Sequence, residues 1–205
     1  EAGHATTSWL LEFAHPLVKV TIVPRGKALG AAWYLPNERQ ITTKEQMYHE
    51  MIATLGGRAA EQLIFGHIST GALSDLEKVT KQATAMIAYY GLDEKIGNRS
   101  YYDSTGQQDY ALTKPFSEKT AEIIDEQVSK LIESAYQEAL RILGENIDGL
   151  TQLANKLIDK EVVFGDDLEM IFGKRPWVKE EIDFPKESQQ TTDTDSEINA
   201  DTDNC

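Results

Sequence analysis

Cysteine is almost absent from this chain of 205 residues, and the only one is Cys205 at its end. A single cysteine forms no disulfide within the chain, which excludes a disulfide-stapled fold and fits a reducing compartment. Long apolar runs are missing as well. The longest uncharged stretches, near residues 28–37 and 82–92, fall well short of the ~18 apolar residues that a membrane-spanning helix needs. We therefore expect no membrane contact from this chain itself.

Positive charge is scarce. Lys and Arg number 20 against 34 Asp and Glu, and the net charge is −14. Nucleic acids and anionic lipids are bound by clustered Lys and Arg, so the composition argues against both as partners. The sequence also contains no G-x-x-x-x-G-K-[ST] phosphate-binding loop.

Composition divides the chain into two parts. After Pro176 there are nine acids and two lysines, so this end carries half of the net charge, and it has few apolar residues. Such a segment buries too little surface to offset the entropy of ordering it. We expect a helical domain over residues 1–175 and an acidic, disordered tail over 176–205. Because the chain begins with neither Met nor a signal peptide, we interpret it as a piece of a longer protein.

Hydrophobic periodicity predicts a mainly α fold with a small β-sheet. Residues 1–14 read as an amphipathic helix, which Pro16 ends. Strands are expected over 17–23 and over 28–35, with a turn at 24–27 between them. Further helices are expected over residues 43–56, 58–65, 74–90, 117–143, 145–159 and 166–172, with a loop over 93–116. Capping is expected from Thr43, and from a capping box of Ser74 and Glu77.

The stretch Glu1-Ala2-Gly3-His4 carries the clearest chemical signal. A glutamate three residues before a histidine on a helix is the second part of the zinc-protease pattern H-E-x-x-H. If a histidine precedes Glu1, two histidines lie one turn apart on one helix face and can share a zinc ion. Zinc lowers the pKa of its bound water to about 7, and Glu1 would take the proton as general base. Without that histidine, the motif is a common chance match and His4 a core histidine.

A catalytic zinc needs a third protein ligand. His15 lies roughly 16 Å along the predicted helix from His4, too far to share a metal. Asp75 is attractive because it begins a strong helix after a glycine-bearing loop, although an aspartate in a first turn is also favoured by the helix dipole alone. Spacing does not choose Asp75 over His49 or Glu61.

Two further interpretations compete here. Glu-x-x-His is also the signature of di-iron helical bundles, and the chain contains it twice, at Glu1/His4 and Glu12/His15. We reject a di-iron site because both copies lie on one predicted helix. The strand over 28–35, with Gly30 inside it, is either the edge of a small sheet or an edge along which an extended substrate pairs. Glycine in a strand often marks the close approach of another backbone.

Five segments together carry a family resemblance: Glu1–Ala5, Pro16–Gly26, Gly56–Glu61, Ser69–Glu77 and Tyr90–Gly97. They resemble segments of the FtsH family of membrane-anchored, ATP-dependent zinc metalloproteases. They occur in the family's order and at its spacings, from Glu1 to about Phe172.

The resemblance implies a helical zinc-peptidase domain. Glu1 matches the catalytic glutamate, His4 the second zinc histidine and Asp75 the third ligand, and the 28–35 strand matches the one that holds the substrate. It also implies a homo-hexamer and an ATPase module, using ATP, in the same parent chain. The expected substrates are misassembled membrane proteins and some soluble proteins. The expected location is the cell inner membrane, with this domain on the cytoplasmic side.

The family's first zinc histidine, its ATPase module and its membrane helices are not in this sequence. With two ligands and a base, we expect the chain alone to bind zinc weakly and to be inactive. The alternative function is a non-catalytic helical module for oligomerisation. The long amphipathic helix from Ser117 and the incomplete site favour that alternative.

Overall fold

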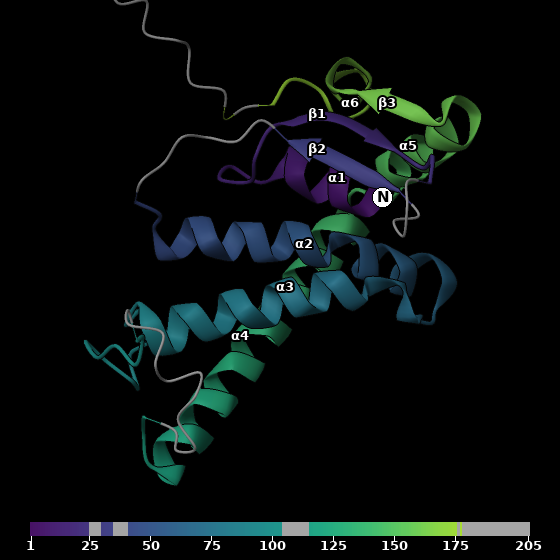
Figure 1. The fold of residues 1–205 in the computed structure, drawn as a ribbon. Helices are drawn as coiled ribbons and strands as arrows, with labels where there is room; N and C mark the ends of the chain where they lie inside the picture. Colours follow the sequence, from purple (N-terminus) through teal and green to yellow (C-terminus); the bar gives the residue numbers. More distant parts are fainter. Residues whose placement is uncertain (25–29, 35–40, 104–114, 176, 178–205) are drawn as a thin grey trace, which may run out of the picture.

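The computed structural model describes residues 1–24, 30–34, 41–103, 115–175 and 177. Over these residues the fold is mainly helical with one three-stranded sheet, which confirms the predicted class. Helix α1 (Ala2–Leu10) lies between the sheet and the long helix α2 (Lys44–Phe65), as Figure 1 shows. Residues 25–29, 104–114 and the predicted tail, apart from Trp177, lie outside the described residues.

The sheet has the strand order β2-β1-β3, and both pairings are antiparallel. The central strand is β1 (Leu17–Thr21), and β2 (Ala31–Tyr34) forms one edge. The other edge, β3 (Val162–Phe164), is absent from the sequence prediction. Three residues are too few to show a period-2 pattern, and they become a strand only because β1 pairs with them.

Helix α1 differs from the amphipathic helix predicted over residues 1–14. It ends at Leu10, and its buried residues include three hydroxyl side chains: Thr6, Thr7 and Ser8. It is therefore buried on most sides, because α2 covers one side and the sheet with α5 (Ile147–Lys160) covers another. Small side chains allow this close packing on both sides.

Helix α2 runs without a break through Gly56 and Gly57, so the predicted division into two helices is wrong. The glycines serve packing rather than helix termination. A side-chain carbon on Gly3 of α1 would lie 2.2 Å from the carbonyl oxygen of Gly56, closer than any side chain can come. The predicted cap is confirmed, since the Thr43 hydroxyl accepts a hydrogen bond from the backbone N–H of Gln46, which completes a capping box.

Helix α3 (Leu73–Thr84) follows a short 3-10 turn, η1 (Thr70–Ala72), and continues into a π-helical turn, η2 (Ala85–Tyr89). The predicted capping box of Ser74 and Glu77 is wrong because the helix already begins at Leu73 and has no side-chain cap. Tyr90, the last residue of the predicted helix over 74–90, is 61% exposed. The wider π turn shifts the helical register, so Ala88 faces the interior instead.

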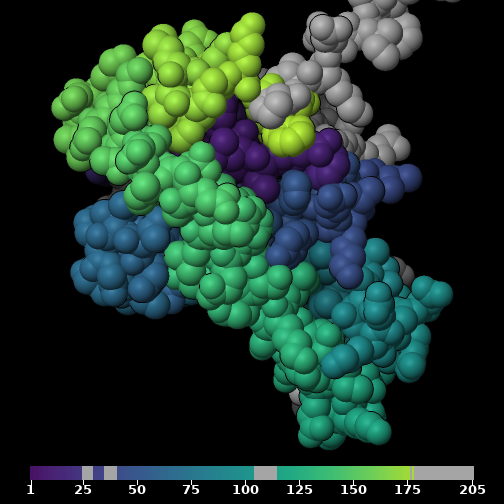
Figure 2. All heavy atoms as spheres, turned by 180° about the vertical axis from the view of Figure 1, so that it is seen from behind, coloured from purple at the N-terminus to yellow at the C-terminus, as the bar shows by residue number. Residues whose placement is uncertain are grey.

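The C-terminal half packs behind these elements. Helix α4 (Glu118–Glu145) begins at a Ser117 cap and passes through Gly144, the predicted end. It stops at Asn146, whose side-chain amide donates to the carbonyl of Ile142 at 2.8 Å. Figure 2 shows α4 in teal-green running across this face of the molecule, with purple N-terminal residues visible beside it. None of the described helices is long and apolar enough to cross a bilayer.

The core has two parts. One joins α2, α3 and α4, with fully buried Met51, Leu55 and Leu143. The other lies between the sheet, α5 and α6 (Gly165–Phe172), and its buried side chains include Val20, Leu153 and Leu168. Ala2 of α1 packs against both parts, so α1 is held from two sides.

Residues after α6 return to the end of α1. The indole N–H of Trp9 donates to the carbonyl of Gly173 at 3.1 Å. The guanidinium of Arg175 donates to the carbonyl of Leu11 at 2.8 Å and also to that of Ala14. Burial lowers the pKa of Arg175. These bonds fix the segment that leads from α1 into β1.

Candidate functional site

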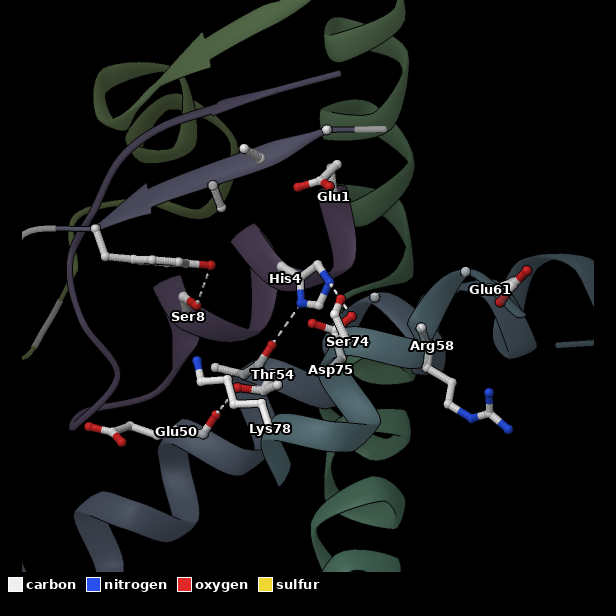
Figure 3. A pocket seen from close by; sticks show the side chains of 18 of the residues that line it. Glu1, His4, Ser8, Glu50, Thr54, Arg58, Glu61, Ser74, Asp75 and Lys78 are labelled. Atoms are coloured by element: carbon white, nitrogen blue, oxygen red, sulfur yellow. Dashed lines mark hydrogen bonds and ion pairs between the residues drawn. The ribbon is translucent and has the colours of Figure 1, made fainter. Parts of the chain in front are cut away.

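A cleft of about 960 Å³ opens between α1, the edge strand β2, α2 and the start of α3. The three predicted site residues, Glu1, His4 and Asp75, all line it. In Figure 3 the imidazole of His4 lies between the carboxylate of Glu1 on one side and that of Asp75 on the other. Residues far apart in the sequence therefore share one cavity.

The His4 ring is oriented by a backbone carbonyl. Its Nδ1 lies 3.0 Å from the carbonyl oxygen of Ala53, which can only accept, so Nδ1 carries the proton and donates it. Its Nε2 lies 3.4 Å from Oδ2 of Asp75. In a neutral ring Nε2 is an acceptor, so two acceptor atoms face each other. Such a contact is favourable only with a proton or a cation between them.

The spacing fits a metal ion. Two ligand atoms bonded to a tetrahedral zinc at about 2.0–2.1 Å lie about 3.4 Å apart, and zinc accepts one nitrogen and one carboxylate oxygen. The His4 and Asp75 side chains are 17% and 28% exposed, so the cleft reaches both. Within the described part of the chain, no group of three or more His, Cys, Asp or Glu side chains is placed to hold a metal. The described residues thus contribute one pair of donor atoms.

The other residues considered as ligands are engaged elsewhere. His49 accepts a hydrogen bond from the backbone N–H of Phe13 at 3.3 Å, and burial lowers its pKa. Glu61 lines the cleft, but its carboxylate accepts from the N–H of Ser69 at 3.2 Å. Hydrogen bonds from the side chain and then the backbone of Ser69 lower the pKa of Glu61. Of the three candidates for the third ligand, the structure brings Asp75 beside His4.

Glu1 lies at the N-terminal end of α1 and faces the edge strand. A side-chain carbon on Gly30 would lie 2.6 Å from Oε1 of Glu1. The glycine therefore leaves room for a carboxylate, rather than for another backbone as the sequence suggested. Any larger residue at position 30 would push Glu1 away from its place.

The sequence did not single out Tyr34 and Ser8, which also line the cleft. The Ser8 hydroxyl donates to the Tyr34 hydroxyl at 3.4 Å. Burial raises the pKa of Tyr34, the hydrogen bond from Ser8 opposes this, and the carboxylates of Glu1 and Asp75 raise it further. Tyr34 therefore stays protonated at neutral pH. No local pattern identifies it, because the Ser8 hydroxyl that it contacts lies 26 residues earlier in the chain.

His15 occupies the cleft as well. The described part of α1 ends before it, so it is not three turns along the same helix as predicted. Its Nε2 pairs with Glu50 at 3.3 Å, and Glu50 also accepts from the side chain of Gln82 at 3.1 Å. His15 is thus held at the α2 side of the cleft.

Comparison with known proteins identifies the family. Residues 1–171 match Peptidase family M41. The chain belongs to peptidase family M41. The predicted resemblance to the FtsH family is confirmed, because relatives named FtsH are 55–57% identical in sequence to this chain.

Three relatives illustrate the similarity. The ATP-dependent zinc metalloprotease FtsH of Parabacteroides distasonis is 57% identical over 211 residues, covering the whole chain and 31% of the relative. That of Karelsulcia muelleri is 55% identical over 171 residues, 83% of the chain and 28% of the relative. The mouse mitochondrial inner membrane m-AAA protease component AFG3L2 is 46% identical over 179 residues, 87% of the chain and 22% of the relative. The chain thus spans less than a third of the length of these relatives.

Proposed function

We propose that this chain is the zinc-dependent endopeptidase domain of a longer, ATP-dependent protease. The single observation that carries the proposal is the contact of 3.4 Å between His4 Nε2 and Asp75 Oδ2 in an open cleft beside Glu1. The M41 membership supports it. A module that serves only oligomerisation, the alternative weighed from the sequence, has no need of this histidine and carboxylate facing each other in an open cleft.

His4 Nε2 and Asp75 Oδ2 would hold the zinc, together with a histidine that precedes Glu1 in the parent protein. When bound, zinc acidifies a water molecule and polarises the substrate carbonyl. The Glu1 carboxylate accepts a proton from the attacking water and delivers it to the leaving amine. The hydrogen bond from Nδ1 of His4 to the Ala53 carbonyl fixes the ring tautomer and its orientation.

The edge strand β2 would hold the substrate. Among the described strands β2 lies at an edge of the sheet, and Ala31 and Ala32 line the cleft. An extended polypeptide that adds to this edge forms main-chain hydrogen bonds independent of its sequence. The small alanine side chains leave room for the side chains of the bound segment.

Features of the whole protein are part of the proposal. We infer a homo-hexamer, with an ATPase module in the same parent chain that uses ATP to deliver unfolded substrates. These are misassembled membrane proteins and some soluble proteins. The parent protein lies in the cell inner membrane with this domain on the cytoplasmic side. The peptidase domain comprises residues 1–175 and is followed by an acidic tail over 176–205. Taken alone, the chain lacks a ligand and is inactive.

Zinc content tests the proposal. In the full-length protein, Asp75→Asn is expected to lower bound zinc from one ion per chain to well below half after dialysis against a weak chelator, because an amide is a poorer zinc ligand than a carboxylate. Glu61→Gln is the matched control, since Glu61 lines the same cleft without contacting His4. Metal analysis with circular dichroism checks both variants. Unchanged zinc in folded Asp75→Asn contradicts the assignment.

A further inference from the structure

Gly56 and Gly57 are adjacent in α2, and both face α1, yet they meet different groups. For each glycine, the atoms that an added side-chain carbon would meet show which group occupies the space beside it. The comparison separates a glycine that serves helix packing from one that serves the candidate metal site.

Gly57 faces the functional nitrogen of His4. A side-chain carbon there would lie 2.3 Å from Nε2 and 2.9 Å from both Cδ2 and Cε1. Nε2 is the atom that faces Asp75, and the opposite ring nitrogen is tied to the Ala53 carbonyl. The ring therefore has no freedom to move aside without losing that hydrogen bond or its alignment with Asp75.

Gly56 faces the backbone of α1 instead. A side-chain carbon there would lie 2.7 Å from the carbonyl oxygen of Gly3 and 2.4 Å from the Thr7 hydroxyl oxygen. Backbone atoms of a packed helix do not move without separating the two helices. The end of a side chain such as His4 can be displaced at much lower cost.

We propose that Gly57 is a positioning residue for the metal: its lack of a side chain keeps the zinc-facing nitrogen of His4 uncovered and directed toward Asp75. This inference rests on the proposed zinc-peptidase function. It assigns the two neighbouring glycines different tasks, since Gly56 sets the distance between α1 and α2 and Gly57 sets the direction of one ligand.

The first test compares Gly57→Ala with Gly56→Ala in the full-length protein. Gly57→Ala is expected to weaken zinc affinity by about 10- to 100-fold, the range seen when a group that orients a metal ligand is lost. Chelator competition measures this affinity. The thermal midpoint of the metal-free Gly57→Ala protein is expected to stay close to wild type, whereas that of Gly56→Ala falls by several degrees. Nitrogen chemical shifts of the His4 imidazole should change in Gly57→Ala without metal.

A double-mutant cycle keeps the test valid even if Gly57→Ala unfolds. In a His4→Ala background the added carbon meets no ring, and alanine is a better helix former than glycine. Gly57→Ala should therefore raise the thermal midpoint of the His4→Ala protein, whatever it does to the wild type.

The outcomes separate the two proposals. If the wild type binds zinc and Gly57→Ala binds it equally well, the role of Gly57 is refuted and the zinc site stands. The same holds if Gly57→Ala lowers the midpoint equally with and without His4. If the wild type binds no zinc that depends on His4 and Asp75, the proposed function itself fails.

Discussion

Two aspartates in the first turns of helices show how the cleft differs from the supporting half of the molecule. Asp167 of α6 contacts the Lys156 amine at 2.5 Å and the Lys160 amine at 3.4 Å, and its other oxygen accepts from the N–H of Phe164 at 3.3 Å. Asp75 of α3 instead faces an acceptor nitrogen. A carboxylate that accepts hydrogen bonds at both oxygens is satisfied by the fold itself, whereas one that faces another acceptor needs a proton or a cation between the two atoms.

This difference predicts separable effects of mutation. Changes around Asp75 should alter chemistry and metal binding with little effect on folding. Changes around Asp167 should alter folding and leave the chemistry of folded molecules intact. The variants that follow test the two sides, from the largest expected effect to the smallest.

Among the cleft variants, Glu1→Gln is expected to cause the largest loss of activity. The amide cannot take a proton from water, so peptide hydrolysis by the full-length protein should fall by roughly 10²- to 10⁴-fold. Zinc content and the thermal midpoint should stay at wild-type values, because Glu1 lies beside the donor pair without being part of it. A fluorogenic peptide assay and metal analysis measure the two quantities. If zinc is lost together with activity, Glu1 has a ligand or structural role and the separation fails.

Gly30→Ala also alters the cleft, and its expected loss of activity is smaller. The added carbon should displace the Glu1 carboxylate, and a displacement on the order of 1 Å is expected to lower kcat by up to about 100-fold. Zinc affinity should be unchanged, in contrast to Gly57→Ala. Ala31→Gly is a suitable control, because it alters the same strand beside the cleft and adds no atoms. Equal kcat for Gly30→Ala and wild type would show that Glu1 tolerates the crowding.

Asp167→Asn tests the supporting side. Its side chain is 13% exposed, and loss of its charged hydrogen bonds should lower the free energy of unfolding by about 1–2 kcal/mol at pH 7. The hydrogen bond with Lys156, the largest cause, lowers the pKa of Asp167 below its value in the unfolded chain. This stabilisation is therefore present above the unfolded pKa of about 3.9 and is lost as pH falls through the folded pKa.

Urea unfolding of wild type and Asp167→Asn at pH 7, 5 and 3 measures that loss. The difference in unfolding free energy should shrink at the lowest pH. Activity per folded molecule at pH 7 should match wild type. A difference that persists unchanged at pH 3 would mean that Asp167 acts through its shape rather than its charge.

The sequence predicted elements whose signals are local. The helical period of α4, the Thr43 cap and the existence of strand β1 all depend on residues close in the chain, and the structure bears them out. The pairing of Glu1 with His4 is equally local, since four residues of one helix fix it. Asp75 was favoured through family resemblance, because the loop before it hides its distance from His4.

The sequence did not predict features that arise from contacts between distant segments. The sequence placed a helix break at Gly56 and Gly57, whereas α1 lies so close that Gly56 faces its backbone and Gly57 faces the His4 ring. β3 exists because β1 lies beside it, and Tyr34 contacts Ser8, which lies 26 residues away in the chain. In each case the deciding neighbour is far away in the chain.

The bonds made by Arg175 bear on where the folded unit can be cut. The family match ends at residue 171, but the guanidinium that holds the carbonyls of Leu11 and Ala14 comes after it, as does the carbonyl that accepts from Trp9. A truncation at the end of the match would leave these groups without their partners at the exit of the helix that carries His4. The sequence match to the family therefore ends before the last residues that hold the site-bearing helix in place.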